Sequence, residues 1–300
     1  MPPLLTVFTP TYNRGYILEQ CYESLTRQTC QDFIWLIVDD GSTDHTQALV
    51  RKWQAEQRVL IRYVYQENQG MHGAHNTAYA LMDTELNVCI DSDDYMPEDA
   101  VEKIIAIWRS CGDKQVAGIV GLDATFSGEI IGTKMPEHIR AATLTELYET
   151  YKIKGDKKLV YRSALTRATP PYPIYPGETY CPLNYKYILI DQQYPLLIYN
   201  DVLCHVEYRE DGSSKNMIHQ YRRNPRGFTF YRKVAMQYAP SFKKCLRESI
   251  HYVSSSLMLK NWRFLLESPK KLSTLCALPF GIALYVYVQG TKRATIMKGS

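Results

Sequence analysis

Three aspartates stand together directly after a short apolar run: Asp91, Asp93 and Asp94 of the stretch VCIDSDDYMPEDA. Carboxylates held a few ångströms apart repel one another, and each raises the pKa of its neighbours unless a cation is present. A divalent ion that prefers oxygen ligands, Mg²⁺ or Mn²⁺, would relieve this repulsion. The stretch therefore predicts a metal site. The alternative is a polar turn with aspartate caps, because D-x-D alone is a weak pattern.

The two acids that end this stretch have a structural explanation. Pro97 suits the first turn of a helix, where a missing N–H has no consequence, and Glu98 and Asp99 complement the positive end of the helix dipole. Phosphatases of the haloacid-dehalogenase type also use D-x-D, but there it usually follows the first strand and has Thr or Val where Tyr95 stands. Only the first three aspartates are therefore expected to do chemistry.

A second acidic cluster, DDGSTD at 39–44, also follows an apolar run. Ser, Thr and Asp accept hydrogen bonds from the first N–H groups of a helix, so the cluster could be only a strand exit with a helix cap. A carboxylate at a strand end can alternatively accept hydrogen bonds from a nucleobase edge, as an acidic residue does for ribose in dinucleotide-binding folds. Both interpretations stay open.

The elements that must position these clusters alternate between strand and helix through residues 1–120. The expected strands are 4–9, 33–40, 59–65, 86–91 and 116–121, and the expected helices are 16–28, 44–56, 72–82 and 97–110. This alternation predicts βαβ units and a parallel sheet covered on both faces, in which ligands bind at the carboxyl ends of the strands. TPTYNR, DDGSTD, ENQGMHGAHN and DSDD each follow a strand, so four loops should converge on one crevice.

The order and spacing of these clusters resemble glycosyltransferase family 2. The resemblance rests on TPTYNR at 9–14, VDDGSTD at 38–44, the N-x-G-x-x-x-A-x-N stretch at 68–76 and IDSDDYMPED at 90–99, and it covers roughly the first 110 residues. It implies an α/β fold of the GT-A type, a Rossmann-like, mixed and mainly parallel sheet with helices on both faces. It also implies an inverting, metal-dependent hexosyl- or N-acetylhexosaminyl-transferase that moves a sugar from a UDP-sugar to a hydroxyl of a surface polysaccharide or a lipid-linked glycan.

The resemblance assigns roles to single residues. Asp93 would be the metal ligand for Mn²⁺ or Mg²⁺. The substrate and nucleotide would be bound by Thr9, Tyr12, Asp40, Asn68, Gly70, His72, Asn76, Asp91 and Asp94. Met71 departs from the family pattern, in which lysine is common at this position.

An inverting transferase needs a carboxylate base for the acceptor hydroxyl, well downstream of the D-x-D. PGETYCP resembles the family's acidic motif, which implies that Glu178 is the general base, although Thr179 replaces a frequent second acid. A surface turn is the alternative, and the rival bases are Asp191, Asp201 and Glu207. The run EYREDGSSKN at 207–216 resembles a segment that follows the base in some relatives; it could close over a diphosphate or be an ordinary polar loop.

Charge is distributed unevenly along the chain. Residues 215–300 hold 16 Lys and Arg and two acids, a net charge of +14, whereas residues 1–214 carry −10. This predicts a catalytic domain at 1–215, with nucleotide-sugar binding at 1–120 and the acceptor side at 121–215, and a basic helical region at 216–300. The eight cysteines have no framework spacing and the N-terminus lacks signal-peptide features, so reduced thiols and a cytoplasmic location are expected.

Residues 272–291 carry no charge and lie between pairs of basic residues. Twenty residues could span a bilayer, but Pro279 and Gly281 interrupt the run and its strongly apolar part is short. A membrane-surface helix, a helix packed on the domain and a spanning helix all stay open, and the first is favoured. Peripheral contact with an anionic membrane, at the inner face of the cytoplasmic membrane, is therefore expected. No nucleic-acid motif accompanies the basic charge.

The sequence leaves two other functions open. A sugar nucleotidyltransferase usually has a Gly-rich, basic loop after the first strand, but TPTYNRG holds one Arg and one Gly. A non-catalytic scaffold or glycan-binding subunit would explain Met71 and Thr179 but not the intact D-x-D.

Overall fold

The structure, a computed structural model, describes residues 3–207 and 217–298, with side chains up to residue 290. The chain forms two compact units. The N-terminal unit consists of Met1–Pro171 and Leu189–Glu207, and the C-terminal unit consists of Tyr172–Ile188 and Tyr208–Ser300.

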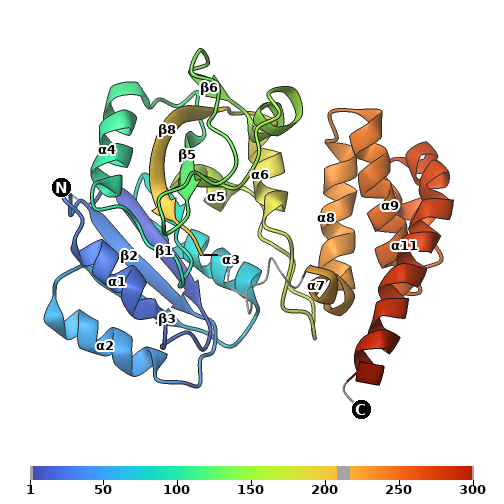
Figure 1. Cartoon of the computed structure of the whole chain (residues 1–300), viewed down its shortest axis with the longest axis horizontal. Helices are drawn as coiled ribbons and strands as arrows, with labels where there is room; N and C mark the ends of the chain where they lie inside the picture. Colours follow the sequence, from blue (N-terminus) through green and yellow to red (C-terminus); the bar gives the residue numbers. More distant parts are fainter. Residues whose placement is uncertain (1–2, 208–216, 299–300) are drawn as a thin grey trace. The chain divides into compact units, whose positions relative to one another are not determined.

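One eight-stranded sheet runs through the N-terminal unit in the order β3-β2-β1-β4-β7-β5-β8-β6 (Figure 1). Its first half is parallel: β3 (Ile61–Tyr65), β2 (Phe33–Asp39), β1 (Leu5–Thr11) and β4 (Leu86–Cys89). Its second half is mixed, because β7 runs antiparallel to β4 and β5, and β6 antiparallel to β8, while β5 and β8 are parallel. These strands are β5 (Gly118–Ala124), β6 (Ala141–Ala142), β7 (Lys157–Arg162) and β8 (Leu196–His205).

Helices cover both faces of this sheet. On one face, apolar side chains of α1 (Leu18–Thr26), α2 (Thr46–Glu56) and α4 (Ala100–Cys111) join those of the strands in one core. On the other face lies α3 (Met71–Leu81), where His75 and Tyr79 meet the ring of Phe8 edge-on. Successive strand residues point to opposite faces, so Thr9 faces α1 whereas Phe8 faces α3. The predicted α/β architecture is confirmed.

The strands and helices predicted for residues 1–120 are all present, with small shifts at their ends. One shift changes an interpretation: α4 begins at Ala100 rather than at Pro97. The carbonyl of Pro97 accepts the Ala100 N–H at 3.0 Å, and Asp99 stands at the N-cap position. Glu98 therefore precedes the helix, where it pairs with Arg27 at 3.3 Å.

The rest of the N-terminal unit contains a π-helical turn η1 (Glu146–Thr150) and α5 (Ser163–Ala168), and α6 (Asn184–Asp191) links the two units. The alternation of strands and helices did not predict β7, which inserts between β4 and β5. Such an antiparallel insertion depends on a pairing between residues far apart in the sequence, which local patterns do not specify.

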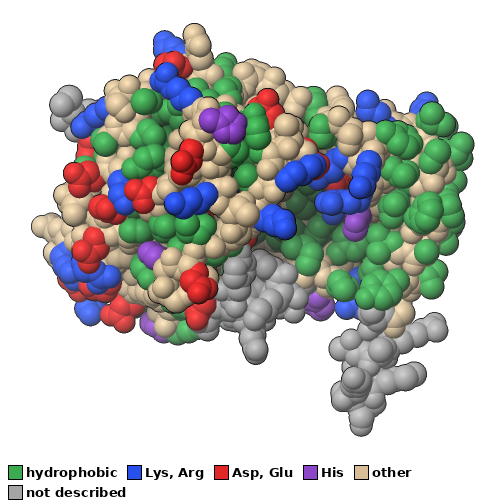
Figure 2. All heavy atoms as spheres, turned by 45° about the horizontal axis from the view of Figure 1, so that its top comes forward, with side chains coloured by type: hydrophobic (Ala, Val, Ile, Leu, Met, Phe, Trp, Pro, Cys, Tyr) green, Lys and Arg blue, Asp and Glu red, His purple; other side chains and the backbone are tan. Residues whose placement is uncertain are grey.

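The C-terminal unit is helical, as predicted for the basic region. It contains α7 (Met217–Arg223), α8 (Pro225–Gln237), α9 (Phe242–Met258), α10 (Phe264–Glu267) and α11 (Lys271–Lys298). Helices α8, α9 and α11 lie side by side (Figure 1), and Met236, Val253 and Ala277, one from each, share a core. Figure 2 shows hydrophobic side chains gathered on the surface of these helices.

The C-terminal unit also includes residues 172–188, which the sequence prediction placed in the catalytic domain. This segment packs on α8, where the rings of Tyr180 and Phe228 stack at 5.5 Å. A Cβ atom at Gly227 would lie 2.4 Å from the carbonyl oxygen of Tyr180, so the close approach requires glycine. The predicted boundary near 215 falls in 208–216, outside the described residues.

Candidate functional site

The carboxyl ends of β1, β2, β3 and β4 are neighbours in the sheet, and a polar cluster follows each of them. Asn13 joins the first two clusters. Its side-chain oxygen accepts the N–H groups of Thr43 at 2.8 Å and Asp44 at 3.3 Å, and its own N–H donates to the Ser42 hydroxyl at 2.8 Å. Asn13 adopts a φ of 52°, which asparagine tolerates better than most residues. The predicted convergence of these loops on one edge is confirmed.

Asp40 joins the second cluster to the third. Its carboxylate accepts the backbone N–H groups of Gln69 at 2.9 Å and Gly70 at 2.8 Å, and the Gln66 side chain donates to it at 2.6 Å. Burial raises the pKa of Asp40, while these three hydrogen bonds oppose the shift. A carboxylate has about four lone-pair positions, so Asp40 retains capacity for one more donor, such as a nucleobase N–H.

Thr9 and Tyr12 lie in different environments. The Tyr12 side chain is 49% exposed just beyond β1. Thr9 is fully buried, and its hydroxyl accepts the indole N–H of Trp35 at 3.0 Å. The Thr9 side chain therefore contributes to the core, and this burial does not favour its predicted contact with the nucleotide.

Gly70 and His72 lie at the start of α3, and Asn76 lies one turn further along the helix. Gly70 has a φ of 81°, a conformation that favours glycine, and it directly precedes the first helical residue. His72 is buried and Asn76 is half-buried. The first N–H groups of a helix carry partial positive charge, so this end of α3 suits an anionic group such as a phosphate.

The three aspartates after β4 divide into an outer pair and an inner residue. Asp91 is exposed and Asp93 is half-buried, whereas Asp94 is only 3% exposed. Burial raises the pKa of Asp94 to about 8, and the negative charges of Asp91 and Asp93 add to the shift. Asp91 and Asp93 therefore lie nearer the solvent, and Asp94 lies inside the loop.

A buried cation lies behind this loop. The Lys158 Nζ on β7 is 3.7 Å from the Asp123 carboxylate on β5 and donates to the Cys89 carbonyl at 3.5 Å. Burial lowers the pKa of Lys158, but Asp123, Asp94 and other neighbours raise it well above its usual value, so this lysine stays charged. Neither Lys158 nor Asp123 was predicted from the sequence as part of the site. The signal was a lysine inside the β-rich run KKLVYR.

The segment after the aspartates is also fixed to β8. The Tyr95 N–H donates to the His205 carbonyl at 3.1 Å, and the His205 N–H donates to the Tyr95 carbonyl at 2.8 Å. Their rings stack at 4.7 Å with an interplanar angle of 16°. Two backbone hydrogen bonds and a ring stack thus hold the loop at one end of β8.

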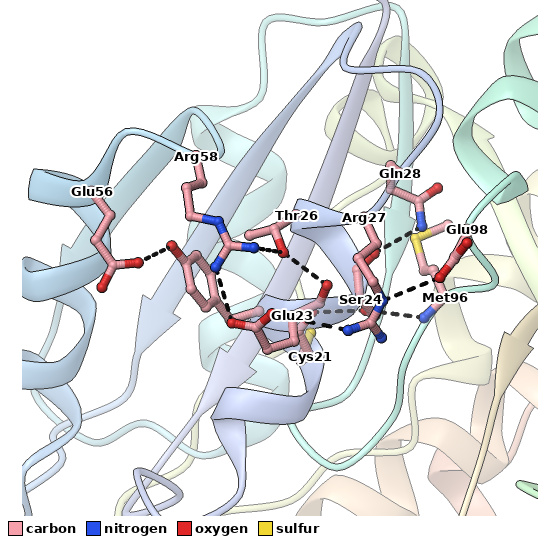
Figure 3. Close-up of polar contacts among 11 residues, drawn as sticks. Cys21, Glu23, Ser24, Thr26, Arg27, Gln28, Glu56, Arg58, Met96 and Glu98 are labelled. Carbon is pink, nitrogen blue, oxygen red and sulfur yellow. Dashed lines mark hydrogen bonds and ion pairs between the residues drawn. The ribbon is translucent and has the colours of Figure 1, made fainter.

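Ser24 of α1 and Gln28, just after α1, hold the next part of the same segment, and Figure 3 shows Ser24 beside Met96. The Gln28 amide nitrogen donates to the Pro97 carbonyl at 2.7 Å, and its oxygen accepts the Val101 N–H at 3.0 Å. The Ser24 hydroxyl accepts the Met96 N–H at 3.3 Å. The backbone between the aspartates and α4 is therefore positioned by buried hydrogen bonds.

Asp91 and Asp93 are the candidate ligands for the divalent ion that the resemblance implies. Within residues 3–207 and 217–290, no three or more His, Cys, Asp and Glu side chains form a group that could hold a metal by themselves. Mg²⁺ is, however, usually bound by one or two carboxylates together with substrate phosphates. The hard oxygen donors of Asp93 and Asp91, at the loop surface, fit such a shared site.

Glu178 and α8 cap each other within the C-terminal unit. The Glu178 carboxylate accepts the backbone N–H groups of Arg226 and Gly227, both at 2.9 Å, in the first turn of α8. In return, the Asn224 side-chain oxygen accepts the N–H groups of Thr179 at 2.8 Å and Tyr180 at 3.1 Å. We call this arrangement the Glu178–Asn224 clasp. Burial raises the pKa of Glu178 above its usual value, and the hydrogen bonds oppose the shift.

The rival bases have partners in the N-terminal unit. The Asp191 carboxylate accepts the N–H groups of Leu144 at 3.1 Å and Thr145 at 2.9 Å, before η1. Asp201 pairs with Lys103 at 3.0 Å. Glu207 is exposed, and the predicted lid that follows it lies at 208–216, outside the described residues.

Comparison with protein families gives one extended match. The model of the family described as Glycosyl transferase family 2 matches residues 6–160, more than half of the chain. This range contains all four polar clusters.

Curated relatives match over shorter ranges. Chondroitin synthase of Escherichia coli is 37% identical over 107 residues, which are 36% of this chain and 16% of that protein. Glycosyltransferase GlyA of Streptococcus pneumoniae is 29% identical over 161 residues, which are 50% of this chain and 22% of that protein. The chain thus spans less than a quarter of the length of either relative.

Solved structures resemble the chain over almost its whole length. Residues 1–349 of S. aureus TarS, in complex with UDP-GlcNAc, give a TM-score of 0.59 at 16% identity and cover 97% of this chain and 92% of that chain. The mannosyltransferase PcManGT of Pyrobaculum calidifontis, in complex with GDP-Man and Mn²⁺, gives a TM-score of 0.55 at 16% identity. This match covers 96% of this chain and 88% of that chain. At these identities the likeness shows the fold, which is of the GT-A type.

Proposed function

Because the chain belongs to glycosyl transferase family 2, we propose that it is an inverting glycosyltransferase that uses a UDP-sugar. The sugar would be a hexosyl or N-acetylhexosaminyl group, and the acceptor a hydroxyl of a surface polysaccharide or lipid-linked glycan. The observation that supports this most is the single edge of the sheet at which Asn13, Asp40 and the aspartates after β4 meet. The UDP-GlcNAc in the related TarS supports UDP as the nucleotide.

The donor would bind across this edge. Asp40 would accept the nucleobase N–H, the exposed Tyr12 ring would border the nucleotide, and the start of α3 with Asn68, Gly70, His72 and Asn76 would face the phosphates. Asp93, with Asp91 beside it, would hold Mn²⁺ or Mg²⁺. When bound, that ion would stabilise the negative charge of the departing diphosphate.

The transfer would be a single displacement. The acceptor oxygen forms a bond to the anomeric carbon while the bond from that carbon to the diphosphate oxygen breaks, and Glu178 takes the acceptor proton. Both Glu178 oxygens are fixed by backbone N–H groups, and each keeps another lone pair for the proton. The clasp would thus orient the base as well as cap α8.

A second candidate is a non-catalytic, glycan-binding subunit of the same fold. The observation that favours it is the same clasp, because a carboxylate that caps a helix has a structural role without any chemistry. Nucleotide binding without turnover, in the presence of the acceptor, would support this candidate.

Turnover of the purified full chain, measured as UDP release from a set of UDP-sugars with Mn²⁺ and acceptor extract, tests the proposal. Glu178→Gln should lower kcat by about 10²- to 10⁴-fold, the usual range for a general base, and should remove the acid limb of the pH profile.

Asn224→Ala is the matched control, because it opens the same clasp and keeps the carboxylate. It should lower turnover less than Glu178→Gln does, because the base remains although the clasp that orients it is opened. Equal losses in the two variants would assign Glu178 a capping role only, and no release from any UDP-sugar would contradict the proposed activity.

A further inference from the structure

Helix α11 has the reverse of the usual surface pattern. Every residue between 272 and 287 that the structure exposes is apolar: Leu272, Leu275, Cys276, Pro279, Phe280, Ile282, Ala283, Val286 and Tyr287. Its inward face holds small and hydroxyl residues, among them Ser273, Thr274, Ala277 and Gly281. A helix on a surface that faces water places its large apolar side chains inward. The outer face of α11 therefore lacks the composition of a solvent-facing surface.

The inward face is tightly packed on α9. A Cβ atom at Gly281 would lie 2.5 Å from the Cβ of Val253, and the hydroxyls of Ser249 and Ser273 are 2.9 Å apart. Small residues thus form the closest contacts of the helix with α9, and most of its large apolar side chains up to Tyr287 are exposed.

Exposed apolar and basic residues also precede α11 in the sequence. Trp262 is 77% exposed and Leu266 is 69% exposed. Four cations in this part of the chain are exposed: Lys260, Arg263, Lys270 and Lys271. The one acid there, Glu267, accepts a hydrogen bond from Lys233 at 3.0 Å. We call Trp262, Leu266 and the outer face of α11, with these four cations, the apolar–basic surface.

We propose that the apolar–basic surface binds the surface of an anionic lipid bilayer, with α11 parallel to the membrane plane. Apolar and aromatic side chains would enter the boundary between headgroups and acyl chains, and the cations would contact anionic headgroups. This surface does not depend on the proposed catalytic activity.

Two other arrangements fit the observations less well. The segment Lys271–Gly290 is long and apolar enough to cross a membrane, with a mean hydropathy of 1.5. However, α9 packs alongside it and carries buried Glu248, which pairs with Arg232 of α8, so inserting α11 would separate these helices or draw charges into the bilayer. A symmetric dimer through this surface would bring two sets of these four cations into one interface.

Vesicle co-sedimentation of the full chain tests the proposal. The protein should bind vesicles of phosphatidylglycerol and phosphatidylcholine, and bind pure phosphatidylcholine more weakly. Phe280→Glu with Val286→Glu should weaken binding by at least about tenfold, because two anchoring side chains become charged. Leu60→Glu is the matched control: Leu60 is 61% exposed in the N-terminal unit, Phe280 is 59% and Val286 is 62% exposed, and binding should stay unchanged.

The depth of two probes distinguishes a parallel helix from a spanning one. Cys276 is an exposed native thiol, and a second probe can be placed by Val286→Cys with Cys276→Ser. The positions lie about 15 Å apart along the helix axis. Lipid-borne quenchers should place both at the same shallow depth.

Three results would overturn the proposal. Equal vesicle binding by the glutamate variant and the wild type would remove this surface from membrane contact. Probes at clearly different depths would indicate a spanning helix. A lipid-free dimer that the same glutamates dissociate, without vesicle binding by the wild type, would identify a second copy of the chain as the partner.

Discussion

At the scale of single residues, the main structural result is the distribution of charge beneath the loop that holds Asp91, Asp93 and Asp94, which we call the acidic loop. Lys158 is the buried cation that lies among Asp123, Asp94 and Asp91, and it stays charged although burial opposes this. A buried charge is stable only when it is paired. We infer that Lys158 and Asp123 allow a loop with three aspartates to fold before any metal ion binds.

Lys158→Met should therefore destabilise the N-terminal unit strongly. The substitution keeps the length of the side chain but leaves Asp123 buried without its partner, which costs about 3–5 kcal/mol for a buried pair. The free energy of unfolding from urea titration measures this loss.

The double variant Lys158→Met with Asp123→Asn is the control. It should regain much of the lost stability, because no unpaired carboxylate remains at position 123. A single variant that loses less than about 1 kcal/mol would show that the pair is not required for the fold.

At the scale of elements, α1 positions the start of α4. The N-cap residue of α4, Asp99, makes no side-chain capping hydrogen bond. The side chain of Gln28, two residues after the end of α1, accepts the Val101 N–H instead. The same amide donates to Pro97, in the segment that follows the aspartates. Packing of α1 on the sheet and the position of the acidic loop are therefore coupled.

Gln28→Leu should lower the free energy of unfolding by about 1–3 kcal/mol, the cost of leaving buried backbone groups unpaired. It should also lower turnover, because the segment from Met96 to Val101 loses its support. Gln20→Leu, at an exposed position of α1, is the control and should change neither quantity. Unchanged stability in Gln28→Leu would contradict the coupling.

Helix α9 carries a histidine whose burial makes the stability of the C-terminal unit depend on pH. Burial lowers the pKa of His251 from 6.5 to about 4, and Arg232 and Arg247 lower it further while Glu248 opposes them. Its Nδ1 has no hydrogen-bond partner within the described part of the chain. The folded protein therefore holds this ring neutral.

The stability from neutral His251 should be fully present above about pH 6.5 and lost as the pH falls toward 4, because the unfolded chain binds the proton first. As the pH falls over this range, the free energy of unfolding of His251→Phe should decrease by about 1–3 kcal/mol less than that of the wild type. Thermal unfolding of both proteins at several pH values measures the difference. Parallel curves would show that His251 does not titrate differently in the folded state.

The strands and loops at the carboxyl ends of β1 to β4 could be predicted from the sequence, whereas the tertiary contacts that hold them could not. Alternating apolar runs predicted β1 to β4 and the loops after them, because periodicity and turn residues are local signals. Lys158 and Gln28 act on residues far away in the sequence, at Asp123 and Val101. Local patterns carry no information on such contacts. For the same reason the cap that Glu178 forms on α8 was not foreseen.

At the scale of the whole molecule, the candidate site residues fall in two units. The N-terminal unit carries the four polar clusters, and the C-terminal unit carries Glu178 and the apolar–basic surface. The uneven charge, +14 over 215–300 against −10 before it, predicted a basic helical C-terminal region, and the described part of that region is helical. Its composition did not reveal that 172–188 joins this region, since the contact of Tyr180 with Phe228 depends on the tertiary fold.

The central claim is that the edge after β4 binds a nucleoside diphosphate sugar through a metal at Asp93. The most direct measurement is UDP release by the full chain with and without Mn²⁺, for the wild type, Asp93→Asn and the control Asp99→Asn, which lies at the start of α4. The claim predicts Mn²⁺-dependent release in the wild type and the control, and a loss of at least about 10²-fold in Asp93→Asn. Mn²⁺-dependent release that Asp93→Asn leaves unchanged would contradict it.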